Sequence, residues 1–362
     1  MARRTGVTEL PLHYGSTSPW LFERMKTLAR QITLVLVEEF GPLEVVRRLA
    51  DPFWFQAFGC LLGFDWHSSG VTTVVCGALK EALRDLAADT GLYVVGGKGK
   101  TSRRTPDELL VVGERTGVDP KPLIYASRMA AKVDSAGLQD GYQIYHHTFI
   151  YTPHGGDGGA WCVVQQGMNP AVRLARRYHW LSTELRDFVC EPHTAVCCDQ
   201  RGDDVLNMVA HEAERAREMS ARLAGERPEL VARDLERLSE LRLPRRHATL
   251  LSDIDPARIK KILLKTYERP PQDFEALLAT EGVGPKTIRA LALVSELIYG
   301  APASFRDPVR FSYAHGGKDG HPYPVDRETY DRTIETLRTA VERARRLGRR
   351  EKLDALRRLA VF

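Results

Sequence analysis

Residues 277–291 read Leu277-Leu278-Ala279-Thr280-Glu281-Gly282-Val283-Gly284-Pro285-Lys286-Thr287-Ile288-Arg289-Ala290-Leu291, and this stretch decides how the C-terminal part of the chain is interpreted. The pattern predicts two helices joined by a glycine hairpin. Gly282 and Gly284 flank one apolar residue, so the backbone can turn through positive φ and approach a ligand closely, because no Cβ stands in the way. Pro285 suits the first turn of the second helix, where its missing N–H is not needed. The free amides and the positive dipole end of that helix would face a phosphate group.

The hairpin resembles a helix-hairpin-helix, spanning about residues 271–300, the module through which many DNA repair proteins hold the duplex backbone without reading bases. The resemblance implies DNA contacts at Gly282, Val283, Gly284, Lys286 and Thr287, and it allows a monovalent cation at the hairpin. The alternative is that the turn is only a tight packing corner between two amphipathic helices. The apolar residue inside the hairpin and the Lys-Thr pair after it favour the DNA-binding interpretation.

A second resemblance concerns chemistry. In base-excision glycosylases that contain this hairpin, the position matching Lys286 can carry a nucleophilic lysine, and a Pro-Val-Asp sequence opens a later helix with the catalytic aspartate. This chain has Pro324-Val325-Asp326, and Asp326 would cap that helix. The resemblance implies that Lys286 attacks the sugar of a flipped nucleotide while Asp326 stabilises the developing positive charge, without any cofactor. The connection between the motifs is longer than in those glycosylases, and Lys286 could instead only contact phosphate.

Two further sets of residues are candidates for function. A glycine-rich loop after the predicted strand 92–95 carries the basic residues Lys98, Lys100, Arg103 and Arg104. We interpret it as a phosphate cradle that contacts the nucleic-acid backbone, and the alternatives are a mononucleotide site and an exposed flexible loop. It fails the P-loop pattern, since the first glycine would fall on Val94. The main alternative to the glycosylase is a nuclease in which carboxylates hold Mg²⁺ or Mn²⁺ and activate water. Its candidate ligands are Asp65, Asp134, Asp140 and His146, although only one of the adjacent His146 and His147 can face a given site.

Composition and patterning set the fold class. The chain has 362 residues, of which 43% are hydrophobic, and its formal charge of +5 makes nucleic acid an accessible partner. Helical patterns fill residues 18–90, and the runs 142–152 and 161–168 predict a β-hairpin. We therefore predict an α+β N-terminal domain over residues 1–200, followed by an all-helical helix-hairpin-helix domain over residues 201–362. No apolar run is long enough to span a membrane and no signal peptide is evident, so the expected location is the cytoplasm.

Over nearly its whole length, the chain also resembles a widespread prokaryotic family known as domain of unknown function 763. The motifs that carry this resemblance are Leu10-Pro11-Leu12-His13, Gly63-Phe64-Asp65-Trp66-His67-Ser68-Ser69-Gly70, Asp140-Gly141-Tyr142-Gln143, Val164-Gln165-Gln166-Gly167-Met168 and His315-Gly316-Gly317-Lys318-Asp319-Gly320. The family supplies no activity. From the hairpin, the sequence predicts a DNA-binding repair protein, either a DNA glycosylase or an abasic-site lyase. A metal-dependent nuclease and a non-catalytic DNA-binding protein are the alternatives.

Overall fold

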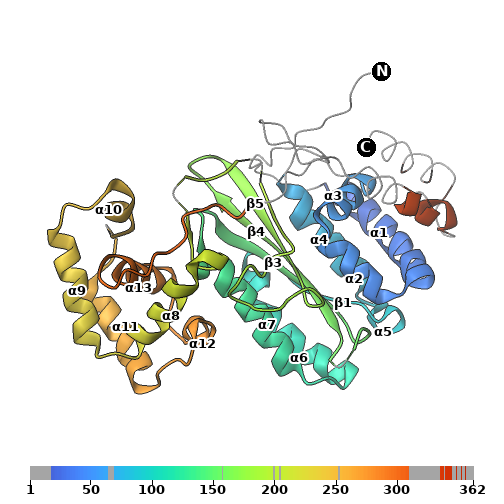
Figure 1. Cartoon of the computed structure of the whole chain (residues 1–362). Helices are drawn as coiled ribbons and strands as arrows, with labels where there is room; N and C mark the ends of the chain where they lie inside the picture. Colours follow the sequence, from blue (N-terminus) through green and yellow to red (C-terminus); the bar gives the residue numbers. More distant parts are fainter. Residues whose placement is uncertain are drawn as a thin grey trace.

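The structure is a computed structural model, and it describes residues 18–63, 69–156, 158–198, 200–203, 205–251 and 253–309, together with 335–337, 339–344, 348, 352 and 355. A five-stranded antiparallel sheet lies at the centre, in the order β1-β3-β4-β5-β6. Helices cover both faces of this sheet (Figure 1). The predicted α+β fold class is confirmed.

The N-terminal part is a group of helices on one face of the sheet. They are α1 (Pro19–Phe40), α2 (Pro42–Ala50), α3 (Pro52–Leu61), α4 (Gly70–Leu83) and α5 (Ala87–Thr90). The starts of α1 and α3 follow from local sequence, because a Ser or Asp side chain placed before a proline caps the free amides of the first turn. Ser18 accepts a hydrogen bond from the amide of Leu21 at 3.3 Å, and Asp51 accepts from the amides of Phe53 and Trp54.

The sheet is formed by long central strands flanked by shorter ones. Its strands are β1 (Tyr93–Lys98), β3 (Gln143–Thr152), β4 (Ala160–Asn169), β5 (Leu174–Leu181) and β6 (Ala195–Cys197). The predicted hairpin 142–152 with 161–168 is confirmed as β3 and β4, which pair from Thr152 with Ala160 to Gln143 with Met168. Successive residues of a strand face opposite sides, and both sides are buried here. Ile150 and Cys162 therefore face the N-terminal helices, whereas Phe149 and Trp161 face the other side.

That other face is covered by α6 (Thr105–Thr116) and α7 (Pro120–Lys132), and α7 continues into a short π-helical turn, Val133–Gly137. Beyond them lies a second group of helices (Figure 1), formed by α8 (Glu214–Ala224), α9 (Pro228–Glu240), α10 (Arg245–Leu251), α11 (Pro256–Glu268), α12 (Phe274–Ala279) and α13 (Pro285–Leu297). One hydrophobic core runs from Phe149 and Trp180 of the sheet to Leu277 and Leu291 of this group. The predicted domain boundary near residue 200 stays a prediction, and the core is continuous across it.

The chain returns from α13 to the sheet through residues 301–309. Ser304 forms a bridge to Asn207 of β7 (Leu206–Asn207), which pairs in turn with β2 (Leu138–Gln139). The prediction that everything after residue 200 is helical is therefore wrong for β7 and for this extended return, because a strand of two residues carries too little pattern to be recognised. Leu337, Ala340, Val341 and Ala344 pack against the N-terminal helices, and Leu337 and Val341 are fully buried.

Candidate functional site

The predicted glycine hairpin joins α12 to α13. Asp273 begins α12 by accepting a hydrogen bond from the amide of Ala276 at 2.7 Å, and Pro285 occupies the first turn of α13 as predicted. Gly282 has φ +90°, which favours glycine, but Gly284 has φ −145°, which any residue adopts. The expectation of a left-handed backbone is therefore correct for Gly282 and wrong for Gly284. Val283 is only 1% exposed, and this anchors the turn in the core.

Both glycines leave open space around the hairpin. A Cβ added to Gly284 would meet nothing within 4 Å, and one added to Gly282 would lie 4.0 Å from Nζ of Lys265. Gly284 caps α13 without a side-chain hydrogen bond, so no side chain of its own covers the first amides of that helix. The side chains of Val283 and Thr287 are buried, so these two predicted contacts can offer only backbone groups. The arrangement is that of an open, positively polarised helix start.

Lys286 lies beside this opening. Its Nζ is 2.9 Å from the carbonyl oxygen and 3.2 Å from a carboxylate oxygen of Asp253, and its side chain is 51% exposed. Arg289 contacts the other carboxylate oxygen of Asp253 at 2.6 Å. Lys286 is thus half-exposed and held in an ion pair with Asp253. Asp326, its predicted catalytic partner, lies outside the described residues.

The hairpin also accepts hydrogen bonds from a lysine that no sequence pattern connects with it. Lys132, at the end of α7, donates to the carbonyl oxygen of Val283 and, at 3.4 Å, to that of Thr280. Burial lowers the pKa of Lys132. Its ammonium occupies carbonyl oxygens of the type that would otherwise coordinate a monovalent cation. The residues are about 150 positions apart in sequence, so no local spacing could have revealed the contact.

The predicted basic loop has a different structure from the one expected. Gly96 to Lys98 belong to β1, and Gly99–Arg104 form a 3-10 helix. A Cβ on Gly96 would lie 2.3 Å from the carbonyl oxygen of His147, so this glycine is needed for β1 to approach β3. Lys98, Lys100, Arg103 and Arg104 are all exposed. Lys98 and Arg104 border a groove of about 650 Å³ whose lining also includes Glu23, Glu81 and Glu108, so both signs of charge meet there.

The structure does not bring the predicted metal ligands together. Within the described part of the chain, no group of three or more His, Cys, Asp and Glu side chains is arranged to hold a metal ion, and Asp65 lies outside it. Burial lowers the pKa of His146 to about 3, and its ring bonds Thr148 rather than a carboxylate. His147, not His146, faces α7, where its ring contacts Ser127 and Gln165.

The carboxylate of Asp140 is held by a cation and a hydroxyl donor of the protein. It forms a buried ion pair with Arg176 at 2.8 Å and accepts a hydrogen bond from the hydroxyl of Tyr178 at 2.7 Å. Arg176 also pairs with Asp307 at 2.7 Å. Burial raises the pKa of Asp140, and Arg176 and Tyr178 act against this rise. The sequence signal for this triad was the pair Arg176-Arg177 within an apolar strand, because arginines buried in a strand need partners.

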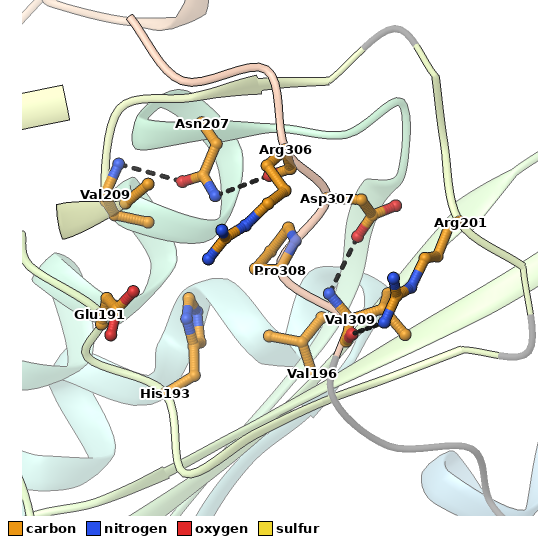
Figure 2. Close-up of a pocket in the computed structure, with 11 residues that line it drawn as sticks. Glu191, His193, Val196, Arg201, Asn207, Val209, Arg306, Asp307, Pro308 and Val309 are labelled. Carbon is orange, nitrogen blue, oxygen red and sulfur yellow. Dashed lines mark hydrogen bonds between the residues drawn. The ribbon is translucent and has the colours of Figure 1, made fainter. Parts of the chain in front are cut away.

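Asp134 forms a dyad with His193. His193 lies at the edge of a pocket (Figure 2). The carboxylate of Asp134 is fully buried, and one oxygen accepts hydrogen bonds from Trp180 Nε1 at 3.0 Å and from Gln165 Nε2. The other oxygen contacts Nε2 of His193, which lines the pocket. The sequence predicted a role for Asp134 as a metal ligand, but its partner is a histidine 59 positions away.

Comparison with known proteins gives one match. Residues 6–325 match the model of a family described as a protein of unknown function, DUF763. The chain belongs to this family. The DUF763 match includes the hairpin, Lys286 and the His193 pocket, and it ends one residue before Asp326. No curated protein and no solved structure matches the chain. Among the described residues, no helix is long and apolar enough to cross a membrane.

Proposed function

We propose that this protein binds DNA by its sugar-phosphate backbone through the 280–287 hairpin and acts in DNA repair. The observation that supports this most is the open start of α13, where Gly284 caps the helix without a side-chain hydrogen bond and a Cβ added to it would meet nothing within 4 Å. Such a helix start offers N–H donors and partial positive charge to an anion. A phosphate of the duplex fits this chemistry, and contacts to phosphates hold DNA irrespective of sequence.

The charges around the hairpin support the same ligand. Lys265 lies beside Gly282, Lys286 beside the start of α13, and Lys132 beneath the turn. The acidic partner of Lys286, Asp253, is 45% exposed, so their ion pair lies in water. Exposed ion pairs contribute about 0–1 kcal/mol. A phosphate can therefore draw Lys286 away from Asp253 at small cost.

Gly284→Val tests the proposed backbone contact. The φ of Gly284 suits valine and its Cβ would meet no protein atom, so we expect the variant to fold normally while its side chain blocks phosphate approach. The dissociation constant for a labelled duplex should rise at least about tenfold, equivalent to about 1.4 kcal/mol, and parent binding should weaken steeply with salt. Fluorescence anisotropy measures both effects. Ala88→Val, at an exposed position of α5, is the matched control. Equal binding by Gly284→Val and the parent would leave the hairpin as a packing corner only.

The position of Lys132 leads to a second prediction, on cation dependence. Because its ammonium already contacts the carbonyl oxygens of Thr280 and Val283, DNA binding by the parent should be the same in potassium and in tetramethylammonium salts of equal ionic strength. Lys132→Met should weaken binding and make it stronger in potassium than in tetramethylammonium, since a small cation can then occupy the vacated carbonyls. A parent protein that requires potassium would show that Lys132 does not serve in place of the ion.

The chemical part of the proposal is base release or abasic-site cleavage at a hairpin lysine. Lys286 is the candidate nucleophile because it follows the hairpin directly and its side chain is 51% exposed. Nζ of Lys132 donates to carbonyl oxygens of the hairpin, so we assign this lysine a positioning role. Asp326 keeps its proposed role as the carboxylate that stabilises positive charge on the sugar.

A further inference from the structure

The pocket that His193 lines is separate from the hairpin and has no role in the function proposed above. It has a volume of about 320 Å³ and lies where residues 306–309 return across the loops before β6 and after β7. Figure 2 shows Glu191, His193 and Arg306 arranged around the same space. Its volume is in the range of small-ligand sites, and its lining is mostly polar, with Glu191, His193, Arg201, Asn207, Arg306 and Asp307 among the lining residues.

The Asp134 dyad fixes the state of the histidine. Trp180 Nε1 and Gln165 Nε2 are donors only, so they use one carboxylate oxygen of Asp134 as their acceptor. The other oxygen then accepts the Nε2 proton of His193. Nε2 therefore carries a proton towards Asp134, and Nδ1 is the ring nitrogen left for a ligand of the pocket. The ring is also held edge-on against Trp180, with centroids 4.7 Å apart.

Two arginines give the pocket its ligand preference. Arg201 makes a single long hydrogen bond, 3.4 Å, to the carbonyl of Val309. Arg306 has a side chain that is 77% exposed, and its Nε is 4.0 Å from Glu212. Within the described part of the chain, most guanidinium N–H groups of these two arginines therefore have no hydrogen-bond partner, whereas the acidic Asp307 beside them is already held by Arg176.

The backbone at Glu191 provides an independent sign that the pocket is built for a ligand. Glu191 has φ +46°, one of two non-glycine residues of the described chain with positive φ. Its amide donates a 2.7 Å hydrogen bond to the carbonyl of Val209, which fixes the loop in this unfavourable conformation. Strained residues of this kind are concentrated at ligand sites, because surrounding structure must stabilise them. His193, two residues later, lines the same cavity as Glu191.

We propose that this pocket binds a phosphate group. Arg201 and Arg306 hold its oxygens. Nδ1 of His193 accepts a proton, either from the phosphate itself or from a hydroxyl of the molecule that carries it. Guanidinium groups match phosphate oxygens in a bidentate geometry. A histidine backed by a buried carboxylate is well suited to take up that proton, because the carboxylate stabilises the imidazolium that results. Asp134 acts through His193 and is a positioning residue. The inference does not depend on DNA binding by the hairpin.

Binding of inorganic phosphate, deoxyadenosine 5′-monophosphate and deoxyadenosine to the full-length protein, measured by calorimetry, tests the proposal. Inorganic phosphate and the nucleotide should bind in a saturable manner, whereas deoxyadenosine should not. Arg201→Gln and Arg306→Gln should each weaken phosphate binding at least about tenfold, the effect of losing a charged hydrogen bond. Both variants alter exposed or half-exposed side chains, and Arg115→Gln, on the exposed surface of α6, is the matched control and should bind like the parent. Equal binding by all three variants, or no saturable phosphate binding, would overturn the proposal.

The histidine is tested by its own signal. In ¹⁵N-detected imidazole spectra, phosphate should shift Nδ1 of His193 towards the protonated form, and His193→Gln should remove this signal and weaken binding. In Asp134→Asn the side-chain amide should change which ring nitrogen of His193 carries the proton, and it should reduce the shift that phosphate causes at Nδ1. A phosphate titration that leaves the His193 signals unmoved would exclude its role. Gly284→Val separates the two proposals, because it should lose duplex binding and keep phosphate binding. An oligonucleotide that competes with phosphate in Gly284→Val identifies a strand phosphate as the ligand, whereas competition by the mononucleotide alone identifies a free nucleotide.

Discussion

Arg176→Met is expected to lower the free energy of unfolding by about 3–5 kcal/mol, the cost of removing one partner from a buried ion pair. Arg176 is 0% exposed, and the Asp140 and Asp307 side chains are 1% and 3% exposed. Without the guanidinium, two buried carboxylates would lose their shared cation. Burial by itself would lower the pKa of Arg176, but Asp140, Tyr178 and Asp307 reverse this and raise it well above its usual value. The charged state of Arg176 is therefore part of the folded structure.

The triad also joins distant parts of the chain. Arg176 lies on β5, Asp140 follows β2, and Asp307 belongs to the return segment, 131 positions from Arg176. Denaturant unfolding monitored by circular dichroism measures the loss of stability. The control is the triple variant Asp140→Asn, Arg176→Met, Asp307→Asn, which removes all three charges and should recover part of the loss. If the triple variant is as unstable as Arg176→Met, lost packing rather than unpaired charge is the cause.

Borohydride trapping on abasic DNA should give a covalent adduct with the parent protein and none with Lys286→Gln. An amine that attacks the sugar carbon forms an imine with loss of water, and borohydride reduces the imine to a stable bond. Lys132→Gln should still form the adduct, in lower yield, because Lys132 supports the hairpin from below. Denaturing gel electrophoresis of labelled DNA separates the adduct from free strand. Lack of an adduct with the parent on every damaged substrate would remove the lyase chemistry and leave a binding protein.

Asp326→Asn distinguishes base release from cleavage. The variant keeps the shape of the side chain but not the charge that stabilises a sugar cation, so it should bind damaged duplex normally and release little base. On abasic DNA, where no base has to leave, the change should matter less than Lys286→Gln. Equal loss on both substrates would show that Asp326 does not act on the departing base.

Sequence reasoning was most successful where the signal is local. The helical patterns of the N-terminal part were recognised from the sequence, and α1 and α3 begin where Ser18 and Asp51 reach amides two or three residues ahead. The β-hairpin of β3 and β4 was recognised because apolar strands flank a glycine-rich turn. The glycine turn before α13 was found for the same reason, although only Gly282 needs positive φ.

The candidate site could be predicted only in part. Lys286 and the glycines are neighbours in sequence, so the motif contains them, and the family match was expected from its motifs. Asp134 was noticed, but as a metal ligand. The glycines of the basic loop were interpreted as a phosphate cradle, yet Gly96 serves the close approach of two strands.

The sequence by itself determined the α+β class, the N-terminal helix starts, the central β-hairpin and the glycine turn before α13, because each depends on residues within a few positions of one another. Tertiary structure alone decided that Lys132 holds the hairpin, that Asp134 meets His193 and that Arg176 joins Asp140 to Asp307. These contacts connect residues between 36 and 151 positions apart. Burial favours them because a charged or polar group removed from water needs a partner. Which partner it finds depends on how strands and helices pack, and no spacing along the chain encodes that.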